Sequence, residues 1–164
     1  VTAQVSTRGH AIEVEDTVGA LLDYGEGHTG YLYTTTAQWP GQMSLEFSGD
    51  DGQLVIQDGR LRLYRLARPL PASLRDAPPF ALPEGTWHDV PLDDDGETGH
   101  AEVLRRFARA VRLGTAPVAA GIDGLHALEL ANALLLSGHT RQPVTLPLDR
   151  DAYDAFLAAK RAGS

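Results

Sequence analysis

Hydrophobic and polar residues alternate with a period of two over most of positions 1–66, as expected for half-buried strands. The alternating runs expected to form strands are 18–24, 31–39, 43–48, 54–56 and 61–63. Glycine-rich breaks separate several of these runs, at 25–27, 49–52 and 58–59, and glycine adopts the positive φ angles of tight hairpins without steric cost. The pattern predicts an antiparallel meander, because such short connections leave no room for crossover helices.

From residue 100 onward, apolar positions recur every three or four residues, which is the spacing of amphipathic helices. One helix is expected around 103–111 with Gly114 as its stop, and a second from an N-cap at Asp123 to Gly138. Asp149 is expected to cap a third, whose inward side chains are Tyr153, Phe156 and Leu157. Strands followed by helices predict an α+β fold: a mostly antiparallel open β-sheet with C-terminal helices packed on one face.

The stretch 67–99 breaks both patterns and holds six of the ten prolines. So long an irregular segment is typical of a lid, a binding loop or an insertion. Short strands are expected at 86–90 within it and at 144–146 further on. The acidic run 93–95, with Glu97, is interpreted as a solvated turn before a helix in preference to a metal site.

Composition narrows the classes of function. The length of 164 residues corresponds to one domain, spanning 1–164, and no apolar run reaches the length of a membrane span. The formal net charge of −8 repels a phosphate backbone, so a nucleic-acid partner is not expected. The chain has no cysteine, which excludes disulfides and cysteine-based catalytic or metal sites. Its single lysine, Lys160, lies near the end of the sequence and is a poor candidate for a catalytic base or a Schiff base.

Gly25, Gly27 and Gly30 spell the dinucleotide-binding pattern G-x-G-x-x-G. That site requires the third glycine to open a helix, whereas residues 31–36 are aromatic, β-branched or leucine and favour a strand. The glycines are therefore assigned to a hairpin, and no cofactor site is predicted in this segment.

Other candidate chemistry is weak. His126 and Glu129 lie three residues apart on a predicted helix, but one pair supplies two ligands and is interpreted as a surface polar pair, so no metal site is predicted. The chain has no G-x-S-x-G nucleophile motif. No catalytic residue is assigned.

A set of short segments stands in a characteristic order and spacing: 99–100, 107–111, 121–124, 129–133 and 144–149, with 48–54 upstream. Together they resemble the C-terminal domain of the glucose-fructose oxidoreductase, inositol dehydrogenase and rhizopine-catabolism (Gfo/Idh/MocA) family of NAD(P)-dependent oxidoreductases. The resemblance covers nearly the whole chain and thins between residues 67 and 98.

The resemblance implies that residues 1–164 form the C-terminal substrate and oligomerisation domain of a sugar or polyol oxidoreductase. The family's N-terminal Rossmann domain and catalytic lysine motif are absent from this chain, so NAD or NADP would be bound by the parent enzyme and this segment alone would not be catalytic. The resemblance places Trp39 and His100 near the sugar. It further implies a cytoplasmic protein that forms a homo-oligomer, a dimer, through its sheet face.

Two alternatives remain open at this stage: a stand-alone carbohydrate-binding or scaffold module without catalysis, and a regulatory protein descended from such an enzyme. Val1 is not methionine, and residues 1–10 lack the features of a signal peptide. A piece of a longer chain is therefore expected, with a processed mature protein as the alternative.

Overall fold

The computed structural model describes residues 1–92 and 99–163, so the acidic run at 93–95 and Glu97 lie outside it. The described elements are seven strands in two antiparallel sheets, four α-helices and one short 3₁₀ helix. The predicted α+β class is confirmed. The chain divides into two compact units, residues 1–39 with 103–164 and residues 40–102.

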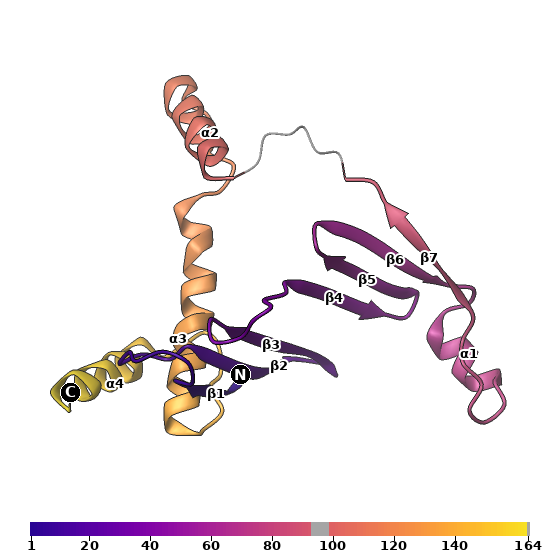
Figure 1. Ribbon diagram of the computed structural model, residues 1–164, viewed down its shortest axis with the longest axis horizontal. Coiled ribbons are helices and arrows are strands. Elements are labelled where there is room, and N and C mark those ends of the chain that lie inside the picture. The colour runs from indigo at the N-terminus through magenta and orange to yellow at the C-terminus, as the bar shows by residue number, and fades with distance from the viewer. Residues whose placement is uncertain (93–98, 164) are drawn as a thin grey trace. The chain divides into compact units, whose positions relative to one another are not determined.

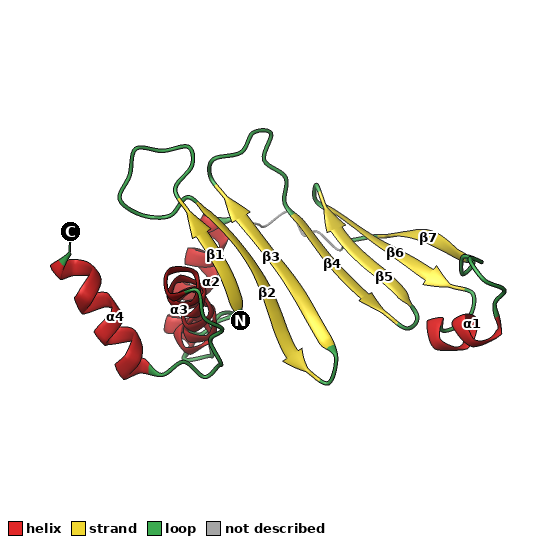
Figure 2. Ribbon diagram, turned by 90° about the horizontal axis from the view of Figure 1, so that it is seen from below, coloured by secondary structure: helices red, strands yellow, loops and turns green. Residues whose placement is uncertain are grey.

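The sheet of the first unit has the order β1-β2-β3 and is antiparallel throughout (Figures 1 and 2). Its strands are β1 (Thr2–Ser6), β2 (Thr17–Gly25) and β3 (His28–Thr35). The turn between β2 and β3 has positive φ at Gly25, Glu26 and Gly27, which confirms a hairpin in place of a dinucleotide-binding turn. β3 ends earlier than predicted, where the Thr35 hydroxyl accepts a hydrogen bond from the backbone N–H of Ala37.

The helices are α2 (His100–Leu113), η1 (Gly121–Asp123), α3 (Gly124–Thr140) and α4 (Arg150–Ala162). The Asp149 side chain caps α4 as predicted, because it accepts a hydrogen bond from Ala152 N at 3.1 Å. Asp123 is the N-cap residue of α3, as predicted, but its side chain makes no capping hydrogen bond to the helix. Its carboxylate accepts a hydrogen bond from the backbone N–H of Ala120 instead. α3 also continues beyond Gly138, the predicted end.

α3 packs along β1, which is an edge strand of its sheet (Figure 2). The buried Ser137 hydroxyl accepts a hydrogen bond from the backbone N–H of Ala3 at 2.9 Å, which satisfies an edge donor that would otherwise lack a strand partner. The core beside it consists of Ala133, Leu148 and Tyr153, with Leu136, Val144, Phe156 and Leu157 packed against them. The inward direction predicted for the α4 side chains is confirmed.

The strand predicted at 144–146 does not form. Val144 instead exchanges two backbone hydrogen bonds with Val1, at 2.8 and 2.9 Å.

The second unit is a four-stranded antiparallel sheet of order β4-β5-β6-β7. Its strands are β4 (Ser44–Gly49), β5 (Gly52–Gln57), β6 (Arg60–Leu66) and β7 (Gly85–Val90), and the strand predicted at 86–90 is confirmed. The helix α1 (Leu70–Asp76) lies within the stretch predicted to be irregular. Proline is tolerated in a first helical turn, which explains why Pro71 does not prevent this helix.

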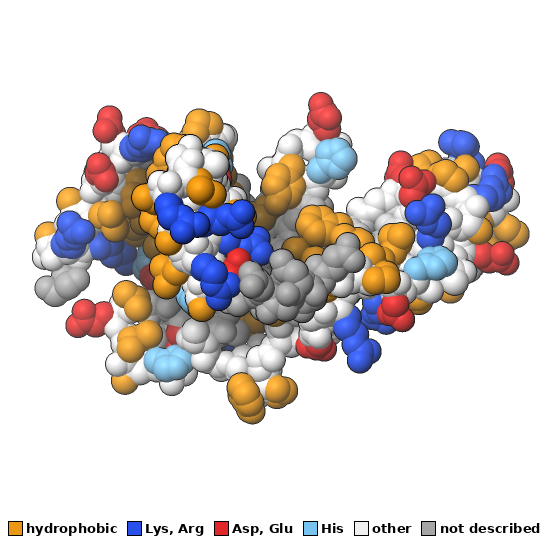
Figure 3. All heavy atoms as spheres, turned by 90° about the horizontal axis from the view of Figure 1, so that it is seen from above, with side chains coloured by type: hydrophobic (Ala, Val, Ile, Leu, Met, Phe, Trp, Pro, Cys, Tyr) orange, Lys and Arg blue, Asp and Glu red, His pale blue; other side chains and the backbone are white. Residues whose placement is uncertain are grey.

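Strand register gives this sheet two different faces, because cross-strand partners point to the same side. One face is mainly apolar, and we call it the apolar face: it carries Leu45, Phe47, Leu54, Ile56, Leu61, Leu63 and Val90, together with Arg65, Thr86 and His88. Hydrophobic side chains at the surface of the protein are visible in Figure 3. The opposite face carries Ser44, Glu46, Ser48, Gln53, Gln57, Arg60, Arg62, Tyr64, Trp87 and Asp89, together with the apolar Val55 and Leu66, and we call it the polar face.

Among the described residues, no helix combines the length and the apolar character needed to cross a membrane.

Candidate functional site

The two residues predicted to contact substrate are both at the surface. Trp39 is the last residue of the N-terminal segment of the first unit, residues 1–39, and its side chain is 92% exposed. His100 is the exposed first residue of α2. Their assignment as binding residues stays a prediction.

The side chains of His126 and Glu129 have different surroundings in the structure. Glu129 Oε1 accepts a hydrogen bond from the backbone N–H of Leu148 at 3.1 Å, which ties α3 to the turn before α4, whereas His126 is exposed. In the part of the chain that the structure describes, no group of three or more His, Asp and Glu side chains could hold a metal ion.

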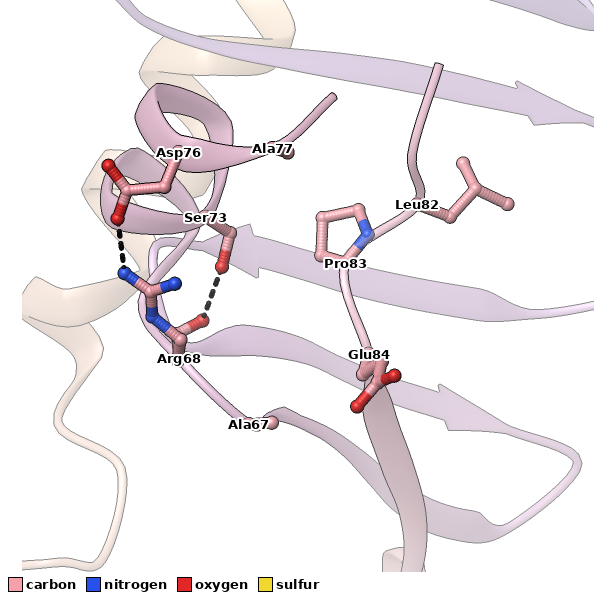
Figure 4. A pocket seen from close by; sticks show the side chains of 8 residues that line it. All are labelled: Ala67, Arg68, Ser73, Asp76, Ala77, Leu82, Pro83 and Glu84. Atoms are coloured by element: carbon pink, nitrogen blue, oxygen red, sulfur yellow. Dashed lines mark hydrogen bonds and ion pairs between the residues drawn. The ribbon is translucent and has the colours of Figure 1, made fainter. Parts of the chain in front are cut away.

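A small cavity of about 200 Å³ lies between α1 and the start of β7 (Figure 4). Arg68 and Asp76 form an ion pair at 2.6 Å on the α1 side of this cavity, and both side chains are more than half exposed. The Ser73 hydroxyl donates to the Arg68 carbonyl. The charged groups are thus already paired in a shallow, solvated recess, which provides little to hold a ligand.

Asp16 is the most strongly held carboxylate of the first unit. It is buried, and its oxygens accept backbone hydrogen bonds from Arg8, Gly9 and His10 at 2.7–3.1 Å and a hydroxyl bond from Thr17. The Gly9 N–H above all holds the pKa of Asp16 below its ordinary value, against the opposing effect of burial. This carboxylate organises the loop between β1 and β2 and has no acceptor capacity directed at a ligand.

A second ionisable group of residues joins three elements. The Lys160 ammonium donates to His139 Nδ1 at 2.9 Å, so the imidazole carries its proton on Nε2 and donates to the Glu15 carboxylate. The His139 ring also stacks on Phe156, with centroids 5.5 Å apart. Burial, with a contribution from the Glu15 charge, raises the pKa of the Tyr153 phenol. The network connects the segment before β2 to α3 and α4.

The polar face of the second unit holds a preorganised aromatic and cationic cluster, which we call the Trp87 cluster: Arg62, Tyr64 and Trp87. The Arg62 guanidinium carbon lies 4.7 Å from the Trp87 ring centroid, within cation–π distance. The Tyr64 and Trp87 rings have centroids 5.1 Å apart and an interplanar angle of 54°. Trp87 is 45% exposed, so its ring is accessible from solvent.

The register of β6 and β7 builds this cluster. Tyr64 is the direct cross-strand partner of Trp87, and Arg62 is two residues from Tyr64 on the same face. Gly85 provides the space for the tyrosine, because a Cβ at this glycine would lie 2.6 Å from the Tyr64 ring. The ring positions are therefore set by backbone pairing.

The charge on this face differs from that of the whole chain. Its basic residues Arg60 and Arg62 equal in number its acidic residues Glu46 and Asp89, against a net charge of −8 overall. The side-chain amide of Gln53 donates hydrogen bonds to the Glu46 carboxylate and to the Ser48 hydroxyl. One of the two acidic groups is therefore hydrogen-bonded to a neighbouring side chain of the same sheet. A polyanion meets much less repulsion here than over the average surface.

Sequence reasoning missed the Trp87 cluster. The alternation of Arg60, Arg62 and Tyr64 along one strand was a usable signal, since all three share a face at a period of two. The position of Trp87 beside them depends on the pairing of β6 with β7 across α1, which no local pattern shows.

The comparisons with known proteins give one informative match. No protein-family model matches the chain. The chain is similar to a protein named tRNA dimethylallyltransferase from Cereibacter sphaeroides, with 34% identity over 128 residues. The match covers 78% of this chain and 41% of that relative, so the chain spans less than half the length of the relative.

This match corrects several expectations drawn from the resemblance. The relative is named as a tRNA-modifying transferase, which contradicts membership of the Gfo/Idh/MocA family and the function of a sugar or polyol oxidoreductase. A parent enzyme using NAD or NADP has no support. The expectation of a sugar or polyol partner and of no nucleic-acid partner is corrected on the same ground, because the relative is named as a transferase that acts on tRNA. The homo-oligomer, a dimer through the sheet face, stays a prediction. The carbohydrate-binding or scaffold module is not supported either.

Proposed function

We propose that this chain is a substrate-contacting part of a tRNA-modifying enzyme, and that it holds tRNA on the polar face of its second unit. The observation that carries the proposal is the Trp87 cluster, in which two aromatic rings and a guanidinium lie together on an open sheet face. The named function of the 34% identical relative supplies the class of nucleic acid.

The chemistry of the cluster suits RNA. Aromatic side chains on an antiparallel sheet can stack on nucleic-acid bases, and arginine can stack on a base or pair with a phosphate. Both rings are held by cross-strand pairing, so little side-chain freedom is lost when a base stacks on them. The balanced charge of the polar face supports binding at this place on an otherwise acidic chain.

In this proposal the chain contacts the substrate and does not perform the group transfer. In the cavity beside α1 the charged groups pair with each other, and the two carboxylate–histidine contacts join structural elements. A tRNA substrate also places the protein in the cytoplasm, as part of the same proposal.

Binding of the full chain to total tRNA from Cereibacter sphaeroides tests the function. A Trp39→Phe background leaves Trp87 as the only tryptophan, so quenching of its fluorescence reports contact at the cluster. We expect saturable quenching. Trp87→Ala in the native background should weaken binding by about 1–3 kcal/mol, roughly 5- to 150-fold, as loss of one stacking side chain does.

Tyr31→Ala is the matched control, because Tyr31 is an 84% exposed tyrosine on a strand of the first unit and lies outside the cluster. Its tRNA affinity should stay within twofold of the unsubstituted chain. Arg62→Gln provides a second test that keeps most of the side chain in place. Absence of tRNA binding, or equal affinity in the Trp87→Ala, Arg62→Gln and unsubstituted chains, contradicts the proposed function.

A further inference from the structure

We infer that the polar face selects unpaired nucleotides and discriminates against duplex RNA. This inference rests on the proposed function and specifies the form of RNA that the Trp87 cluster takes. Three features of the second unit support it: the spacing of the two rings, the origin of the surrounding side chains in strands alone, and the small number of cations beside the rings.

The spacing of the rings requires accessible base faces. Tyr64 and Trp87 are on adjacent strands with centroids 5.1 Å apart and inclined by 54°, so a stacked base must present its flat face to one of them. In a duplex each base face is covered by its neighbours, whereas unpaired bases can turn outward and stack on aromatic side chains. The rings thus have partners in a single strand and none along a helix.

The shape of the polar face also excludes groove binding. Duplexes are read by an element that enters a groove or by contacts spread along the backbones of both strands. The polar face consists of side chains from β4, β5, β6 and β7, and the helix α1 of the same unit follows β6 in the chain and contributes none of them. Because every one of these side chains comes from a strand, this face would meet a duplex chiefly at its phosphates.

Too few cations lie on this face to bind a duplex through phosphates. Arg60 and Arg62 are its basic residues, and Glu46 and Asp89 oppose them. Neutralising about two phosphates predicts a slope of roughly −1.4 for the logarithm of the association constant against the logarithm of salt concentration with single strands. Binding should therefore depend mainly on stacking and weakly on salt.

The experiment compares two RNA probes on the full chain: an unstructured eight-nucleotide RNA of mixed sequence and a blunt-ended twelve-base-pair RNA duplex made of two separate strands. We expect the single strand to bind at least tenfold more tightly than the duplex, with a salt slope no steeper than about −2. Trp87→Ala should remove most of this preference, and Trp87→Phe should retain it because a ring remains. Far-ultraviolet circular dichroism establishes that each variant is folded.

The outcomes separate this inference from the proposed function. If tRNA binds through the cluster but the duplex binds as tightly as the single strand, the inference is overturned and the function stands. A salt slope steeper than about −4 also overturns it, because that slope needs more phosphate contacts than two arginines make. If neither probe nor tRNA binds, the proposed function itself fails.

Discussion

Gly138 on α3 lies directly against Val5 on β1. A Cβ built on Gly138 would come 2.6 Å from Val5 Cγ1 and 2.8 Å from its Cγ2, which is closer than real Cβ contacts allow. The helix reaches the edge strand at this distance only because residue 138 has no side chain. Glycine is therefore required in the last turn of α3, close to where sequence reasoning placed the helix end.

Gly138→Ala should destabilise the protein by about 1–3 kcal/mol, because an added methyl group overpacks the contact between α3 and β1. Gly124→Ala is the matched control, since no atom lies within 4 Å of the Cβ position at the start of the same helix. Urea unfolding measures both changes. The double variant Val5→Ala/Gly138→Ala should recover part of the stability lost in Gly138→Ala. If Gly138→Ala is as stable as the Gly124→Ala control, the close contact between Gly138 and Val5 is refuted.

Ser137→Ala should cost about 1–3 kcal/mol of stability, because it leaves the edge N–H of Ala3 without its acceptor. Thr140→Ala provides the comparison, since Thr140 is exposed and its hydroxyl donates to a helix carbonyl that is already bonded in the helix. That change should stay within about 0.5 kcal/mol. Thermal unfolding distinguishes the two, and equal midpoints for Ser137→Ala and Thr140→Ala would show that the Ala3 bond contributes nothing.

Asp16 should make stability depend on pH in the acid range. Its folded pKa is lowered from the usual 3.8, so the folded state gains stability above that value and loses it progressively as pH falls below it. Asp16→Asn removes the charge, and the stability gap between it and the native chain should be full at pH 6 and narrow below about pH 4. Asp154→Asn, an exposed substitution on α4, should show no such convergence. A gap that stays constant from pH 6 to pH 2.5 rules out the charge of Asp16 as its cause.

Gly85→Ala should weaken RNA binding through the Trp87 cluster, because the new methyl group occupies the space of the Tyr64 ring. We expect a several-fold loss of affinity and a changed near-ultraviolet circular dichroism signal as the two aromatic rings separate. Gly49→Ala in the same sheet has no atom within 4 Å of its Cβ position and is the control. Unchanged RNA affinity in a folded Gly85→Ala chain would show that RNA binding does not depend on the geometry of the two rings.

The sequence by itself determined the strands and helices whose signals are local. Hairpins at 25–27, 49–52 and 58–59 form where glycines permit positive φ, and the Asp149 cap forms because its hydrogen bond spans three residues. The α+β class follows from these elements alone. Local reasoning failed where a short segment was ambiguous, as at α1, whose prolines favour a loop in general but are tolerated in a first helical turn.

Only the tertiary structure decided what depends on groups distant in the chain. Ala3 and Ser137 are separated by 134 positions, and neither residue carries a pattern that identifies the other. The Trp87 cluster requires β7 to pair with β6 in one register after the intervening α1, and a slip by one residue would turn Trp87 to the apolar face. Propensities and periodicities act within a few residues, whereas edge satisfaction, close helix approach and a shared sheet face arise from packing between segments. In the candidate site, the shared face of Arg62 and Tyr64 follows from local alternation, whereas the position of Trp87 beside them arises from packing between segments.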